Sequence, residues 1–306
     1  MGSAMNCFAD RYVSKVSWTA VRRSYCPYCG HTLAPRDMIP VLSYIFLRGR
    51  CRYCKRKIRP RYFVCECLLG ICFAAVYATH ISLDGPAVIC DMLSQWVLVC
   101  CLLPLSLIDI DSYIIPNRFI IIPAAARAVY VWFFGLHSGF PECDGFLDLY
   151  GKTDTVHALW GGCKSLFFCL LTGLCVGGAL LLLSLVMDRV LGRESMGGGD
   201  IKLFACVSMF FSPCGIMLVL LMSCIIGITL SIFMQKEMPE DMDGIPVDGS
   251  AGDETAEKGE NTDTDTGECD EIPPEAFPFG PSIAAAAFLG LIFAERLAEL
   301  YIDKFF

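Results

Sequence analysis

The chain has 306 residues, of which 55% are hydrophobic, and its formal net charge at pH 7 is −8. A mean hydropathy of +0.55 excludes an ordinary soluble domain of this length. Residues 165–187 and 203–234 contain no charged side chain. Each stretch exceeds the roughly 20 residues that a helix needs to cross a bilayer. The composition therefore predicts an all-α polytopic membrane protein.

Apolar runs predict a series of helices along the chain. The predicted ranges are 65–81, 87–108, 118–136, 158–187, 200–211, 214–234 and 279–300. Residues 200–211 make only about 18 Å of helix, so this helix must pack against others. Residues 1–11 make about half a bilayer of helix at most, which indicates a truncated first helix. We expect a bundle of about seven transmembrane helices, and in-frame apolar codons upstream of Met1.

Basic residues predict the orientation of the chain in the membrane. Residues 11–61 hold thirteen of the 24 Lys and Arg residues, whereas 82–86 and 137–157 hold one between them. The positive-inside rule then places residues 11–61 in the cytoplasm. Counting crossings from there, 109–117 and 188–199 also face the cytoplasm.

Four of the nineteen cysteines differ from the rest. Most cysteines lie in or beside apolar stretches, where a free cysteine behaves as a small hydrophobic residue. Two Cys-x-x-Cys pairs instead lie in the charged cytoplasmic segment, at Cys26, Cys29, Cys51 and Cys54. Two such pairs can close a tetrahedral zinc site, and the cytoplasm disfavours disulfides. We predict a zinc-binding insert; the alternative is four surface thiols without a metal. His31 is interpreted as a surface histidine.

Residues 236–275 form a second extramembrane segment, with 15 acidic residues and two lysines. Almost no aromatic side chains are present, and Gly, Thr and Asp are frequent. This composition predicts a disordered loop. We expect that a short Gly/Ser linker can replace residues 240–272.

Two aspartates are predicted at the cytoplasmic ends of apolar helices. Asp109 ends one helix in SLIDIDSYIIPN, and Asp200 begins another in SMGGGDIKLF. Two neighbouring carboxyl groups share a proton because like charges close together cannot both ionise cheaply. The ionised one accepts a proton from water and the protonated one polarises a carbonyl, as in aspartic proteases. Taken alone, Asp109 is equally consistent with a solvated helix cap.

Small and basic residues surround the second motif. Glycines 197–199 would let a substrate backbone approach closely and would allow a turn with positive φ. Lys202 either biases Asp200 towards its ionised form or extends to the membrane interface, and we favour the interface.

Several motifs resemble the bacterial type IV prepilin peptidases, a family of bifunctional leader peptidases and N-methyltransferases. GSAMNCFADR is similar to the family's GSFLN-x₄-R helix end, and residues 23–62 are similar to its tetracysteine domain. IDIDSYIIPN resembles ID-x₅-LPD, with Asn117 in place of the usual Asp. GRESMGGGDIKL resembles GKEGMGxGDFKL, and FPFGPSIAAAA resembles the PFGP helix start. The resemblance covers nearly the whole chain in order.

The resemblance implies roles for individual residues. The family's catalytic aspartates fall on Asp109 and Asp200, whereas Asp111 falls on a variable position and is assigned no catalytic role. The zinc ligands fall on the four cysteines of the insert. Supporting or substrate-binding roles would belong to Gly197, Gly199, Lys202, Glu66 and Glu194, the two glutamates attracting a basic leader.

The resemblance also implies substrates and cofactors. The substrates would be prepilins or pseudopilins with a short basic leader, a glycine at the cleavage point and a long apolar helix. S-adenosylmethionine would be the methyl donor, although the sequence contains no glycine-rich nucleotide-binding loop for it. Zinc is the second cofactor. The lipid bilayer is a partner, and nucleic acid is not.

The expected function is therefore a membrane aspartic endopeptidase that cleaves prepilin leaders on the cytoplasmic face of the bacterial membrane and N-methylates the product. The expected parts are a helix remnant at 1–11, a zinc domain at 12–64, a catalytic membrane domain at 65–235, the acidic loop at 236–275 and a last helix at 276–306. Alternatives are a presenilin-like GxGD intramembrane protease without methyltransferase activity, a transporter with a zinc ribbon, and a non-catalytic zinc-ribbon assembly factor.

Overall fold

The computed structural model of the chain is helical, which confirms the predicted all-α class. It describes residues 12, 25–26, 28–34, 37, 39, 41–81, 85–135, 145, 147, 154–192, 196–237 and 278–305. Within these residues, β-structure is limited to two isolated bridges, Tyr25 with Thr32 and Arg50 with Lys57. The predicted helix remnant at 1–11 and nearly all of the predicted acidic loop lie outside the described residues.

Among the described residues, seven helices correspond to the seven predicted ranges, and one further short helix, α2, was not predicted. They are α2 (Leu42–Phe46), α3 (Pro60–His80), α4 (Pro86–Ser112), α5 (Arg118–Phe134), α7 (Thr155–Leu191), α8 (Gly198–Ser208), α9 (Pro213–Glu237) and α10 (Gly280–Phe305). The largest boundary differences are five residues: α3 begins at Pro60 rather than at 65, and α10 ends at Phe305 rather than at 300. Pro60 suits the first turn of a helix.

Four of the described helices are long and apolar enough to cross a membrane. They are α3, α4, α7 and the Pro213–Ile232 part of α9. α5 has 17 residues and α8 has 11, and the apolar part of α10, Gly280–Phe293, is also short. α8 is therefore a packed helix of less than bilayer length, as its sequence predicted.

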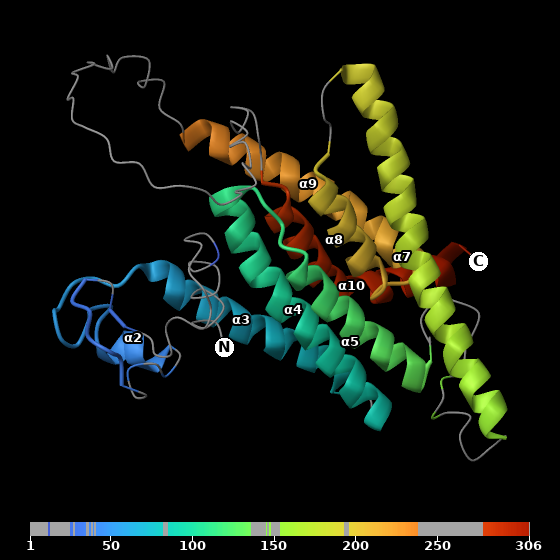
Figure 1. Ribbon diagram of the computed structural model, residues 1–306, viewed down its shortest axis with the longest axis horizontal. Helices are drawn as coiled ribbons and strands as arrows, with labels where there is room; N and C mark the ends of the chain where they lie inside the picture. Colours follow the sequence, from blue (N-terminus) through green and yellow to red (C-terminus); the bar gives the residue numbers. More distant parts are fainter. Residues whose placement is uncertain are drawn as a thin grey trace, which may run out of the picture.

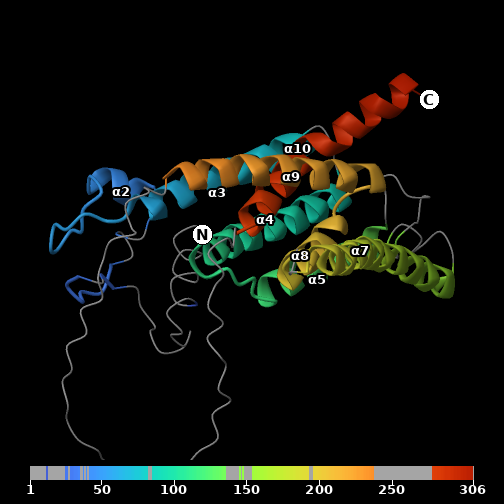
Figure 2. The same ribbon diagram turned by 90° about the horizontal axis from the view of Figure 1, so that it is seen from above.

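The helices form two layers on either side of α4. α10 packs against α9 and α4, while α5 packs between α4 and α7, and α8 lies along α7. Figure 2 shows α3, α9 and α10 on one side of α4 and α5, α7 and α8 on the other. The shared core contains fully buried side chains from α4, α8 and α10, including Leu105, Ile108, Phe204 and Ile283.

Close packing positions α8 within this arrangement. A Cβ atom on Gly173 of α7 would stand 3.0 Å from the carbonyl oxygen of Ala205 in α8, and one on Gly177 would stand 3.0 Å from Ala205 Cβ. Small residues of this kind let two helices in a membrane approach closely. The rest of α7 exposes large apolar side chains such as Leu174 and Val190, which is typical of a surface covered by lipid.

Candidate active site

Asp109 lies in the last turn of α4, and only 4% of the residue is exposed. The backbone N–H of Gly280, the first residue of α10, donates a hydrogen bond of 2.8 Å to Asp109 Oδ2. Unpaired amides and the helix dipole make a helix N-terminus favourable for a negative charge. α10 therefore holds the Asp109 carboxylate in place and stabilises its ionised form.

Gly280 is required at this position by the close approach. A Cβ atom there would stand 2.7 Å from Asp109 Oδ2 and 3.1 Å from its Cγ. Contacts that short do not occur between real atoms without a shift of one of them. The glycine of the FPFGPS motif thus explains how the start of α10 reaches a buried carboxylate.

Asp200 lies in the first turn of α8, outside the four candidate membrane spans. Its Oδ1 atom is buried and has no hydrogen-bond partner among the described residues. Burial and the negative charge of Asp109 raise the pKa of the Asp200 carboxyl to about 7. The two aspartates are thus close enough to interact electrostatically, although they belong to different helices.

The glycines before Asp200 do not form the predicted turn. Gly197 has φ −64° and ψ 135°, and Gly198 and Gly199 already belong to α8, so the expectation of positive φ is wrong. Their lack of a side chain serves packing inside the chain. A Cβ on Gly199 would stand 3.0 Å from Ile115 Cβ, and one on Gly197 would stand 3.4 Å from Asp200 Oδ2. Gly199 therefore lets the start of α8 approach the segment that follows α4.

Asp111 has a partner outside the candidate site. Its Oδ2 atom accepts a hydrogen bond of 2.7 Å from Arg61 Nη2, and its Oδ1 atom accepts one of 3.2 Å from Nη1. This bidentate ion pair connects the end of α4 to the start of α3. Asp111 is accordingly a structural link between two helices, in agreement with the absence of a catalytic assignment.

The structure shows a hydrogen bond within the chain for Glu66, and its predicted role towards a basic leader stays a prediction. Glu66 Oε2 accepts a hydrogen bond of 2.7 Å from the amide of Val41, which has a positive φ of 61°. A β-branched residue rarely adopts this conformation, and the bond holds it. One oxygen of Glu66 is thereby engaged with the insert. Lys202 is exposed on α8, whereas Glu194 lies outside the described residues.

The four predicted cysteines come together in the insert, from two loops of the same geometry. In the first loop, Cys26 N donates to the His31 carbonyl and Gly30 N donates to the Cys26 carbonyl, both at 2.9 Å. In the second, Cys51 N donates to the Arg56 carbonyl at 2.9 Å, and Lys55 N donates to the Cys51 carbonyl at 3.0 Å. His31 is exposed, as predicted, and its ring lies 3.6 Å from that of Tyr53.

The thiol geometry fits a tetrahedral metal ion. The four Sγ atoms lie within 4.8 Å of one another, and those of Cys26 and Cys54 are 3.9 Å apart. Zinc bonded to sulfur at about 2.3 Å separates its ligands by about 3.8 Å. Burial of Cys51 favours the neutral thiol, but hydrogen bonds from the Cys54 and Tyr53 backbone outweigh it and lower its pKa to about 7. The thiolate form of Cys51, one of the four possible ligands, is thus accessible near neutral pH.

Two family models match consecutive parts of the chain. Residues 1–80 match the Bacterial Peptidase A24 N-terminal domain, and residues 96–232 match the Type IV leader peptidase family. The first range contains the four cysteines and the second contains Asp109 and Asp200. The chain belongs to the type IV leader peptidase family. It is accordingly a multi-pass membrane protein of a bacterial family of prepilin leader peptidases and N-methyltransferases.

Three curated relatives are 26% to 30% identical to the chain over the aligned residues. The prepilin leader peptidase/N-methyltransferase of Aeromonas hydrophila is 26% identical over 296 residues, covering 93% of this chain and 76% of the relative. The type 4 prepilin-like proteins leader peptide-processing enzyme of Escherichia coli O78:H11 is 29% identical, and the match covers 73% of this chain and 71% of the relative. The prepilin leader peptidase/N-methyltransferase of Myxococcus xanthus is 30% identical, and the match covers 76% of this chain and 61% of the relative. No solved structure matches the chain significantly.

One buried cluster of charged and polar side chains was not predicted from the sequence. Arg127 of α5 pairs with Asp91 of α4 and donates a hydrogen bond of 3.0 Å to the carbonyl of Met209, at the end of α8. Asp91 also lies 3.2 Å from His80 of α3. Charged residues inside apolar helices are rare. The sequence therefore contained a signal in each of two helices, Asp91 in α4 and Arg127 in α5. The cluster connects four helices and holds the end of α8 that is opposite to Asp200.

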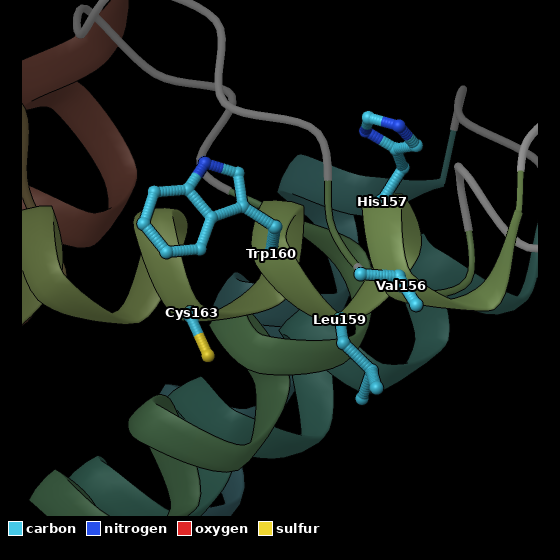
Figure 3. Close-up of a pocket in the computed structure, with 5 residues that line it drawn as sticks. All are labelled: Val156, His157, Leu159, Trp160 and Cys163. Carbon is cyan, nitrogen blue, oxygen red and sulfur yellow. The ribbon is translucent and has the colours of Figure 1, made fainter.

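A hollow at the start of α7 is a weaker candidate for a site. Its lining residues are Val156, His157, Leu159, Trp160 and Cys163. Figure 3 shows that all five belong to one helix and that their side chains spread in different directions. They do not converge on a shared point, and neither aspartate contributes to the hollow. The helix ends that carry Asp109 and Asp200 therefore remain the best site for chemistry in this family member.

Proposed function

We propose that this chain cleaves the leader peptide of prepilins, with Asp109 and Asp200 as its catalytic acid–base pair. One observation carries the proposal: the end of α4 and the start of α8 bring two carboxyl groups into electrostatic contact beside the N-terminus of α10. Family membership supplies the reaction class, peptide hydrolysis. Asp109 and Asp200 would supply the base and the acid for this reaction.

The environments of the two carboxyl groups suggest separate roles. Asp109 receives the Gly280 amide and faces a helix dipole, so it is the ionised partner and removes a proton from the attacking water. Asp200 has a pKa near 7 and an Oδ1 atom without a partner. It is the protonated partner, which donates to the carbonyl oxygen of the scissile peptide. When the C–N bond of the tetrahedral intermediate breaks, Asp109 passes that proton to the leaving amine, and Asp200 recovers its own proton from a hydroxyl group of the intermediate.

The substrate class follows from the family and from the position of the pair. Prepilins carry a basic leader followed by a long apolar helix, and the leader must be cut where that helix enters the membrane. We place both aspartates at the cytoplasmic surface of the bacterial cytoplasmic membrane, because the basic segment 11–61 orients the chain. The bundle would contain about seven transmembrane helices: the four long spans, α5, α10 and the truncated first helix.

The proposal also includes a second activity, a structural metal ion and the division of the chain into parts. The curated relatives are named as N-methyltransferases, so we assign methylation of the new N-terminus, with S-adenosylmethionine as donor. The four cysteines would hold one zinc ion, which supplies structural cross-linking of the insert. The division of the chain into insert, catalytic membrane domain and acidic loop forms part of the same proposal, with the first boundary moved to Pro60.

Co-expression with a candidate prepilin, followed by mass spectrometry of its N-terminus, tests peptidase and methyltransferase activity together. The expected product is shortened and carries one additional methyl group. An intact prepilin in the presence of folded, membrane-inserted enzyme would contradict the peptidase assignment. A shortened but unmethylated product would contradict only the methyltransferase half. A non-catalytic assembly factor predicts that Asp109→Asn and Asp200→Asn both leave pilin processing unchanged.

A further inference from the structure

The insert holds its short helix α2 directly beside the beginning of α3. The amide of Val41, at the start of α2, donates to Glu66 of α3 at 2.7 Å. The ring of Tyr44 stacks on that of Phe63 with 4.8 Å between centroids. Glu66 lies about 9 Å along α3 from Pro60, at 1.5 Å per residue. α2 is thus fastened where a membrane-spanning helix begins, and Figure 1 shows it at this end of α3.

α2 exposes apolar side chains that the described residues do not cover. Leu42 is 52% exposed, Ile45 is 56% exposed and Phe46 is 81% exposed. Tyr44, on the other face, packs against Phe63 of α3. Val64 and Leu68, in the first turns of α3, are about half exposed. The apolar patch of α2 therefore lies beside the start of a helix that itself exposes apolar side chains.

Cations follow the apolar patch immediately. A shallow hollow is lined by Leu47, Arg48, Arg50, Cys51 and Lys55. Exposed basic residues continue along the chain at Arg56, Lys57 and Arg59. The single acidic residue in 12–61 is Asp37, and it is paired with Arg52 at 2.6 Å. This combination of cations and apolar side chains is complementary to the surface of an anionic bilayer.

We propose that the insert lies on the membrane surface, with Leu42, Ile45 and Phe46 among the acyl chains of one leaflet and Arg48 and Arg50 on phospholipid phosphates. The apolar tip enters the interface because α3 carries α2 to that depth. The cations then lie at headgroup level, where each gains from an anionic lipid. The lipid would thereby hold the metal-binding loops against the bundle at the point where α3 enters the membrane. This inference does not depend on the catalytic assignment.

The test uses the full chain in lipid nanodiscs, with a photoreactive side chain introduced by Phe46→p-benzoylphenylalanine. The matched control is Tyr28→p-benzoylphenylalanine, because Tyr28 is 51% exposed on the first cysteine loop. Irradiation followed by mass spectrometry counts phospholipid adducts at each position. We expect adducts at position 46 to exceed those at position 28 by about five-fold or more, as interfacial burial requires. Equal yields, or adducts only to protein segments, would overturn the proposal.

A second comparison tests the cations. Nanodiscs of phosphatidylcholine alone are compared with nanodiscs that also contain anionic phosphatidylglycerol. We expect anionic lipid to raise the adduct yield at position 46, and Arg48→Ser with Arg50→Ser to reduce that gain by about five-fold per cation. The zinc content, measured by elemental analysis, shows that the insert is still folded. An anionic-lipid effect that survives both substitutions would remove the two arginines from the proposal. The same yields are expected in an Asp200→Asn background.

Discussion

The backbone N–H of Gly280 lies 2.8 Å from Oδ2 of Asp109, although 171 residues of chain separate the two. The contact joins the end of α4 to the beginning of α10. It gives one member of the proposed pair a fixed hydrogen-bond donor, whereas Oδ1 of Asp200 has none among the described residues. The asymmetry of the pair therefore originates in a helix that carries neither carboxylate.

Gly280→Ala should impair turnover without unfolding the protein. The new methyl group would stand 2.7 Å from Asp109 Oδ2, so the carboxylate must move and lose its amide donor. A hydrogen bond to a charged group is worth about 1.5–3 kcal/mol, and kcat should fall by about 10- to 100-fold with a smaller change in KM. Gly178→Ala is the matched control, since no heavy atom lies within 4 Å of that Cβ position. Wild-type kcat for Gly280→Ala would show that the amide does not support catalysis.

Asp109→Asn and Asp200→Asn should each abolish cleavage while the protein still inserts into membranes. General acid–base catalysis contributes about 10²- to 10⁴-fold, and neither residue can supply it alone. Asp111→Asn should retain most activity, because it loses only a partly exposed ion pair with Arg61. Such pairs contribute about 0–1 kcal/mol. An active Asp109→Asn beside an inactive Asp111→Asn would reverse the assignment.

Cleavage should decline as the pH rises above neutrality. Asp200 acts in its protonated form, and its pKa is raised to about 7, so alkaline pH removes the catalytic proton. The rate profile of the purified enzyme should show an alkaline limb with an apparent pKa near 7 that belongs to the pair. Because the same carboxyl group titrates near 4 in an unfolded chain, the stability that its protonated form contributes is lost as the pH rises from about 4 to about 7. A profile that is flat up to strongly alkaline pH would exclude Asp200 as the acid.

Cys51→Ser should remove the metal from the insert. Wild-type protein purified without chelators should contain about one zinc ion per chain. Loss of a thiolate ligand also removes folding free energy, so protease should cut the insert faster in the variant. Cys163→Ser on α7 is the control, because Cys163 is exposed and lies outside the cysteine cluster. Zinc-free wild-type protein with a protease-resistant insert would refute the site.

Local patterns predicted the helices well, because hydrophobic runs can be read within short segments. The catalytic role of the two helix-end aspartates stays a prediction. The structure corrected what depends on contacts between distant segments. Glycines 197–199 suggested a turn with positive φ beside the substrate, but two of them belong to α8 and Ile115 occupies the space beside Gly199. The hydrogen bond from the Val41 amide to Glu66 also joins distant segments, and the predicted attraction of Glu66 for basic leaders stays a prediction. The pairing of Arg127 with Asp91 required knowledge of which helices are neighbours, which periodicity alone does not contain.

The contact between Gly280 and Asp109 also has a consequence for biosynthesis. Ribosomes make Asp109 first, Asp200 next and Gly280 last, so both carboxyl groups are present before the amide that distinguishes them. In a nascent chain that has inserted α4 and α8 but not α10, Asp109 lacks the Gly280 amide as its hydrogen-bond donor. On the proposed assignment, the full cleavage rate is therefore reached only when α10 docks. The order of synthesis would thus keep an unfinished peptidase less active beside the prepilins that are inserted into the same membrane.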